Sequence, residues 1–246
     1  MTQPTEGPSK DLQPLGESSS DTARALLKGA LSAIPILGGV VSEIVGTIIP
    51  DQRIERLEDY VRQLGEQLAT IDHAEIAARM TNPESVDLFE DGAFASARAL
   101  SSDKRERIAR LVANGISGDD QSRIEAKRLI ALIAQLDDDQ VIRLTSYLHR
   151  NQRDRDFHVT HEAVLAPSRA HLGSSRDELD KAVVRDLGRE ELLRLGLLRE
   201  RFKKLKKGEL PELDEKTGRM KVQSREISPL GRLLLRRLGL AADDEF

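Results

Sequence analysis

Residues 51–72 read DQRIERLEDYVRQLGEQLATID, and this stretch decides the fold. Its apolar side chains recur at alternating spacings of three and four residues, while Arg, Glu, Asp and Gln fill most positions between them. Over about three heptads, that period keeps the apolar residues in one row on one side of an α-helix. We call this row the seam; it consists of Ile54, Leu57, Val61, Leu64, Leu68 and Ile71.

Two kinds of partner can cover the seam. Other helices of the same chain would make residues 51–72 one member of an intramolecular bundle. A second copy of the seam would instead make a self-associating coiled coil. The positions beside the seam carry few complementary charges, which favours the bundle for this helix. We also expect the chain to form a homo-oligomer through the seam.

The composition points to a mainly helical protein. Of 246 residues, 39% are hydrophobic, 33% are charged and only 3% are aromatic, with no Trp. The core must therefore come from Leu, Ile, Val and Ala, a set that favours helices over sheets. No alternating, strand-like run occurs before residue 150. The absence of Cys excludes disulfides, thiolate metal sites and cysteine nucleophiles.

The C-terminal part reads differently. A turn signal at 214–218 separates two short runs that can pair as a hairpin, and Ser228-Pro229 is typical of a helix start. We expect a helical hairpin and a helical bundle, followed by a small winged-helix-like α+β domain. The predicted units are a disordered tail at 1–20, an apolar hairpin at 21–50, a helical body at 51–150, a linker at 151–178 and a winged-helix-like domain at 179–240.

Residues 29–50, GALSAIPILGGVVSEIVGTIIP, form the most apolar stretch. Pro35 and the Gly38-Gly39 pair break it into two helical pieces, and Glu43 is costly in hydrocarbon. Three readings stay open: a buried hairpin, reversible membrane insertion, and a constitutive span. We expect a cytoplasmic protein with peripheral association at the inner membrane. The hairpin residues singled out are Ile34, Pro35, Ile36, Leu37, Gly38, Gly39, Val40, Val41, Glu43, Ile44 and Val45.

Charge is divided unevenly along the chain. Residues 1–150 hold 17 Lys/Arg and 24 Asp/Glu, whereas 185–237 hold 16 basic and 9 acidic residues. A basic segment of this kind can neutralise phosphates, so nucleic acid is a second candidate partner. A solvated helix end is the alternative interpretation of 199–207. The candidate contacts are Arg201, Lys203, Lys204, Lys206, Lys207, Arg219, Lys221 and Arg225.

Motifs for catalysis are missing from the sequence. His158, His161 and Glu162 follow one another closely, but they do not form the HExxH pattern of metallopeptidases. Nucleophile-elbow, P-loop and dinucleotide-binding motifs are absent. We therefore expect no enzyme, no catalytic residues, no bound metal and no cofactor.

The order of several short motifs carries a family resemblance. These are LSSDKRERIARLVANGIS (100–117), LIAQLDDDQVIRL (132–144), LGLL (195–198) and ISPLGRLLLRRL (227–238). Over roughly 80–238 the chain is similar to bacterial proteins of the abortive-infection alpha family. The resemblance implies a bacterial or prophage protein in antiphage defence, with no catalytic residues to carry over.

Two functions follow as expectations. The first is a non-enzymatic helical protein that acts through protein contacts and conditional membrane engagement of residues 29–50. The second is a winged-helix nucleic-acid-binding regulator that uses the basic C-terminal segment.

Overall fold

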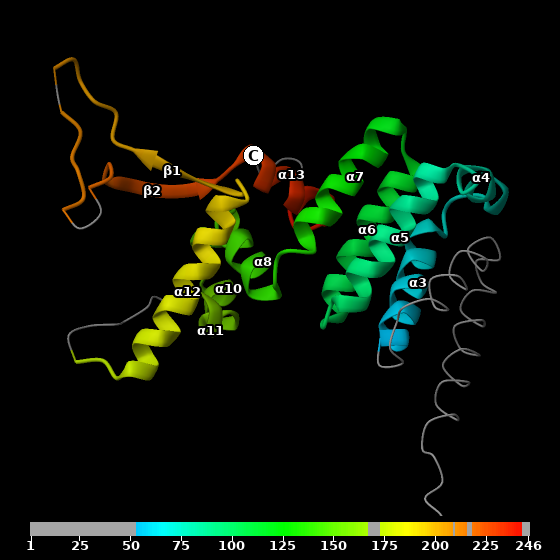
Figure 1. Cartoon of the computed structure of the whole chain (residues 1–246), viewed down its shortest axis with the longest axis horizontal. Coiled ribbons are helices and arrows are strands. Elements are labelled where there is room, and N and C mark those ends of the chain that lie inside the picture. The colour runs from blue at the N-terminus through cyan, green and yellow to red at the C-terminus, as the bar shows by residue number, and fades with distance from the viewer. Residues whose placement is uncertain (1–52, 167–172, 209, 216–217, 243–246) are drawn as a thin grey trace, which may run out of the picture.

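The computed structural model describes residues 53–166, 173–208, 210–215 and 218–242 (Figure 1). This part is mainly helical, with a two-stranded antiparallel sheet and one further helix near its C-terminal end. The prediction of a mainly helical fold with a small α+β unit at its C-terminal end is therefore confirmed. The predicted tail at 1–20 and the hairpin at 21–50 lie outside the described residues.

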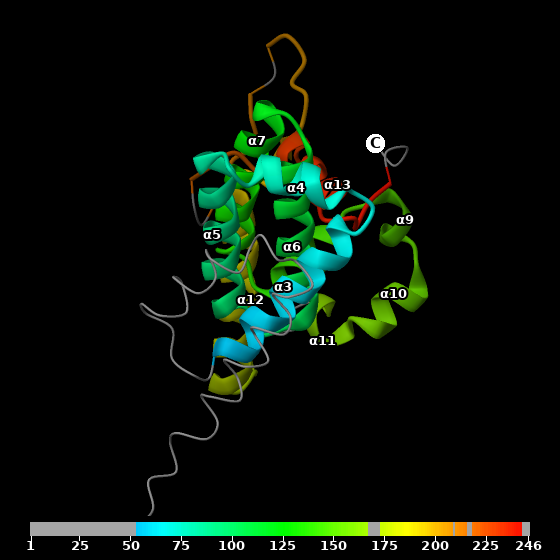
Figure 2. The same cartoon turned by 90° about the vertical axis from the view of Figure 1, so that its right-hand side faces the viewer.

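The body is built around one central helix, α6 (Ser102–Ser117). Four other helices contact it along its length (Figure 2). They are α3 (Ile54–Leu68), α4 (His73–Arg79), α5 (Pro83–Arg98) and α7 (Asp120–Ile133). Short polar caps mark where these helices begin: the side chains of Asp72, Asn82, Ser101 and Asp119 each accept a hydrogen bond from a backbone N–H of the first turn.

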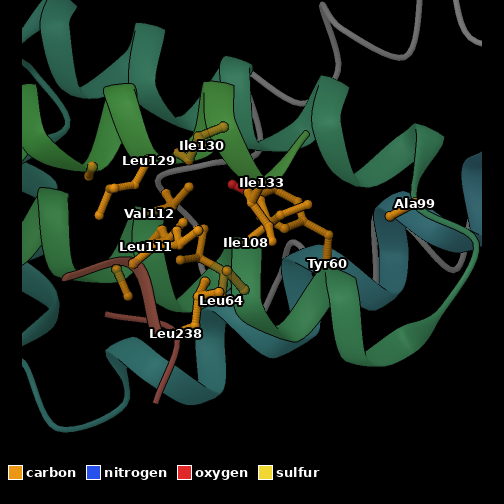
Figure 3. Packing of buried hydrophobic residues seen from close by; sticks show 14 of the residues in the cluster. Tyr60, Leu64, Ala99, Ile108, Leu111, Val112, Leu129, Ile130, Ile133 and Leu238 are labelled. Atoms are coloured by element: carbon orange, nitrogen blue, oxygen red, sulfur yellow. The ribbon is translucent and has the colours of Figure 1, made fainter. Parts of the chain in front are cut away.

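The seam of α3 faces the core of its own chain. Ile54, Leu57, Val61, Leu64 and Leu68 are each at most 2% exposed, and Ile71 is partly buried against the same core. Figure 3 shows Leu64 and Tyr60 beside Ile108, Leu111 and Val112 of α6. Of the two alternatives, the structure therefore shows the intramolecular bundle. Self-association through the seam is corrected, because side chains buried this deeply offer a second copy no surface unless the core opens.

A carboxylate at the edge of this core holds α3 to the start of α6. Asp59 accepts hydrogen bonds from Arg105 Nε at 2.6 Å and from Ser102 Oγ at 2.9 Å. The side chains of Asp59 and Arg105 are only 17% and 12% exposed. Partial burial raises the pKa of Asp59, but the hydrogen bonds from Arg105, Arg62 and Ser102 outweigh it and leave the pKa below its usual value.

Replacing Asp59 with asparagine should lower the free energy of unfolding by about 2 kcal/mol at neutral pH, because Arg105 loses its charged acceptor. A lowered pKa gives stability that is present at neutral pH and lost as the pH falls through the folded-state pKa. The difference between wild type and variant in urea denaturation should therefore shrink below about pH 4. Asp103→Asn is the control, since Asp103 is 80% exposed and 3.8 Å from Arg107. An equal loss in both variants would contradict this role of Asp59.

Residues 151–178, expected as an irregular linker, contain helical turns. After α8 (Asp138–Thr145) come α9 (His149–Gln152), α10 (Arg155–Thr160) and α11 (Glu162–Leu165). Neither α10 nor α11 buries a residue, which explains why no apolar period revealed them. Local capping forms α10 instead, because the Asp154 side chain accepts the first backbone N–H groups.

The C-terminal unit runs helix, hairpin, helix. Its elements are α12 (Arg176–Arg194), β1 (Leu198–Phe202), β2 (Val222–Ile227) and α13 (Pro229–Arg237). The predicted short pairing is present as a bridge between Leu213 and Met220. One continuous cluster of buried residues joins this unit to the body, including Leu192, Leu198, Ile227, Leu234, Leu235 and Leu238.

Candidate anion-binding cleft

The hairpin projects from the body as an arm (Figures 1 and 2). The structure places six of the predicted nucleic-acid contacts along the part of this arm beyond the paired strands. They are Lys203, Lys204, Lys206, Lys207, Arg219 and Lys221. All six are exposed, and Glu212 lies 3.7 Å from Lys203 and 3.6 Å from Lys221. The distal arm is therefore basic, with part of its charge balanced locally.

The other two predicted contacts, Arg201 and Arg225, line a cleft at the base of the arm. Its volume is about 520 Å³. Arg199 and Arg232 also line it, together with Tyr147 from the segment after α8 and with His149 and Gln152 of α9. Four arginines and Glu226 give the lining a formal charge of +3 with His149 neutral. Guanidinium groups bind phosphate and carboxylate oxygens in pairs, so the cleft suits an anion.

Strand geometry fixes the arginines of the hairpin. Alternation along β1 puts Arg199 and Arg201 on one face. Antiparallel pairing sets Arg199 opposite Glu226 and Arg201 opposite Ser224. Glu226 bridges both arginines, with Arg199 Nε at 2.6 Å and Arg201 Nη1 at 3.0 Å.

A tight turn seats α13 against the start of β1, which brings Arg232 to the cleft. The Ser228 hydroxyl donates to the Gly196 carbonyl at 2.6 Å and accepts the Gly231 N–H at 3.0 Å. The Ser228 N–H donates to the Leu197 carbonyl at 3.0 Å. Ser228 therefore holds the helix start and the strand start together, and Arg232 follows in the first turn of α13.

The electrostatics of the cleft favour added negative charge. Partial burial raises the pKa of Glu226, but Arg199 and Arg201 outweigh it and leave that pKa below its usual value. Glu226 is therefore ionised at neutral pH and orients its two arginines. Arg225 lies 3.4 Å from Glu200, and within the described part of the chain its buried Nε atom has no hydrogen-bond acceptor.

Sequence reasoning missed several residues of this cleft. Arg199 belongs to a basic run whose composition also fits a helix end, whereas the structure has β1 there. Arg232 stands out in the sequence only as part of a helix-start motif, and His149 and Gln152 only as part of a helix. LRERF (198–202) gave no strand signal, because its three central residues are all charged and show no alternation of apolar and charged positions.

The remaining predicted sites are distributed as follows. The imidazoles of His158 and His161 lie around the Phe157 ring, with centroid distances of 6.0 Å and 4.7 Å. In the described ranges, no group of three His, Cys, Asp or Glu side chains could hold a metal ion. No helix of the described part combines the length and hydropathy needed to cross a membrane. The hairpin residues Ile34 to Val45 lie outside the described residues.

Comparison with protein-family models, with curated proteins and with solved structures found no match to this chain.

Proposed function

We propose that the C-terminal unit binds nucleic acid through its phosphate backbone. The observation that carries this proposal is a cleft lined by Arg199, Arg201, Arg225 and Arg232. Arg199 and Arg201 share one face of the hairpin, and Arg225 pairs with Glu200 on the other face. Strand pairing fixes the backbone of Arg199, Arg201 and Arg225. The first turn of α13 fixes that of Arg232. Preorganised guanidinium groups lose less freedom on binding than exposed lysines do.

The arm extends the same charge away from the cleft. Its lysines at 203, 204, 206 and 207 lie on the segment that continues β1. In a winged-helix domain the hairpin after a helix lies along the nucleic-acid backbone, and we propose this wing role for residues 203–221. Guanidinium groups match phosphate oxygens, so we expect binding to depend on charge rather than on sequence.

Removal of two cleft arginines should weaken binding strongly. We expect Arg201→Gln with Arg225→Gln to reduce affinity for a labelled 20-base-pair duplex of about two turns by roughly 100-fold, since each charged hydrogen bond is worth about 1.5–3 kcal/mol. The slope of log affinity against log salt should fall by about 0.9 for each phosphate that the variant no longer neutralises. Fluorescence anisotropy at several salt concentrations measures both.

Arg176→Gln with Lys181→Gln is the matched control, because it removes the same number of positive charges from exposed residues of α12, which is not part of the cleft. It should change affinity less than twofold. Equal affinity of the double variant and wild type, or binding that does not respond to salt, would overturn the proposal.

A specific observation also favours the other expected function, protein contact. Helix α12 exposes an apolar row in which Leu179 is 44%, Val183 is 68% and Leu187 is 57% exposed. Solvated helices rarely keep three large apolar side chains one turn apart without a partner. Membrane engagement of residues 29–50 and a role in antiphage defence stay predictions.

A further inference from the structure

A groove between α5 and α7 is an apolar feature of the body that the nucleic-acid proposal leaves unused. Its volume is about 390 Å³, and Phe94, Ala95, Ile130, Ala131 and Ala134 supply its apolar surface. Phe94 is 45% exposed, although aromatic side chains this large are usually covered. The groove therefore has the character of a surface that another apolar segment covers.

We propose that residues 29–50 of the same chain dock in this groove. Glu43 is the single charged residue among these mostly apolar residues, and they end three positions before Arg53, where the described chain begins. The inference does not depend on nucleic-acid binding.

The position of α3 supports this occupant. In its first turn, Arg56 Nη1 donates to the Ala97 carbonyl in the last turn of α5 at 3.2 Å. The chain that precedes α3 therefore starts beside the end of α5. Phe94 lies one turn before Ala97 on the same helix, so the described chain begins beside the helix that forms one wall of the groove.

Charge also matches this segment to the groove. Arg98 stands at the rim and is exposed, and among the described residues it has no carboxylate partner. Two other cations line the groove: Lys104 donates to the Leu136 carbonyl, and Lys127 is paired with Asp87 and with Asp91. Glu43 is the single charge that residues 29–50 can offer, and Arg98 is the cation left to receive it. An ion pair here would orient the docked segment.

Docking would also regulate the apolar segment. While it occupies the groove, its Ile, Leu and Val side chains are withdrawn from water, from lipid and from other proteins. Any ligand that competes for the groove, or any change that weakens the pair of Glu43 and Arg98, would release it. The groove is thereby the site that controls exposure of residues 29–50.

The test places a single fluorophore in the segment. The chain has no Trp, so Val41→Trp in the full-length protein gives one indole signal. We expect a blue-shifted emission maximum and weak quenching by acrylamide. Adding Ala131→Glu, at an exposed position of the groove, should shift the emission to the red and increase quenching at least threefold. Circular dichroism checks that the helical body is intact.

Two further variants sharpen the result. Val184→Glu adds the same charge at a 67% exposed position of α12 and should leave the indole protected. Arg98→Glu should expose the indole, and adding Glu43→Arg should protect it again.

Four outcomes would overturn the proposal. If acrylamide quenches the indole strongly without any groove substitution, the segment is not bound to the protein. Protection that survives Ala131→Glu means that another surface covers the segment. Protection that is lost on dilution means that a second copy of the chain covers the segment. Protection that arises only with anionic phospholipid vesicles means that a membrane covers it.

Discussion

Replacing Gly92 with alanine is expected to lower the free energy of unfolding by about 3 kcal/mol, the upper end of the usual cost of overpacking. A Cβ atom at Gly92 would lie 2.5 Å from Val112 Cγ2 and 2.6 Å from Tyr60 Oη. Val112 and Tyr60 are both fully buried, so neither can move into solvent. Tyr60 also donates from its hydroxyl to the Phe89 carbonyl at 3.3 Å, a bond that the shift would break. Urea denaturation followed by circular dichroism measures the loss.

The control is the same substitution at a helical glycine with room around it. At Gly188, in α12, an added Cβ would have only Gln140 Cγ nearby, at 3.7 Å. Gly188→Ala should therefore stabilise the protein by up to about 1 kcal/mol through helix propensity alone. If both substitutions stabilise, the close contact of α3, α5 and α6 at Gly92 is not what limits this position.

The contrast between these glycines shows what the sequence could and could not reveal. The apolar period from Ile54 to Leu68 predicted the helix and its buried side correctly. A helix that is buried along one side has apolar residues every three or four positions, and this spacing is visible in the sequence. The helix start at Ser228-Pro229 was also predicted correctly, since the Ser228 cap acts on the first turn of its own helix. Whether a glycine lies at a close contact between helices depends on residues far from it in the sequence, so its sequence neighbours do not predict it.

The strand β1 and the arginine-lined cleft were hidden for a related reason. LRERF pairs with Ile227 and its neighbours across more than twenty residues, and the adjoining lysines made the segment look like a helix end. Arg199 and Arg232 meet only after the turn at Ser228 has formed. The residues predicted from charge alone therefore divided between the arm and the cleft.

One substitution tests how closely folding and binding are linked at this turn. Gly231→Ala is expected to cost about 3 kcal/mol in unfolding free energy, because its Cβ would lie 2.4 Å from the Leu197 carbonyl oxygen and 2.9 Å from Ile227 Cγ1. A backbone oxygen cannot rotate away as a side chain can, so α13 must move off β1 and carry Arg232 out of the cleft. We therefore expect duplex DNA affinity to fall at least tenfold, measured by anisotropy at a temperature where circular dichroism shows a folded protein.

Leu230→Ala is the control for this turn, since the neighbouring Leu230 is 36% exposed. It should cost less than about 1.5 kcal/mol, well below a buried Leu→Ala change, and leave affinity unchanged. The proposal ties Arg232 to the ligand through the position of α13. A destabilised Gly231→Ala protein that still binds DNA with wild-type affinity would contradict this link. In that case the strained turn would not affect the DNA-binding surface.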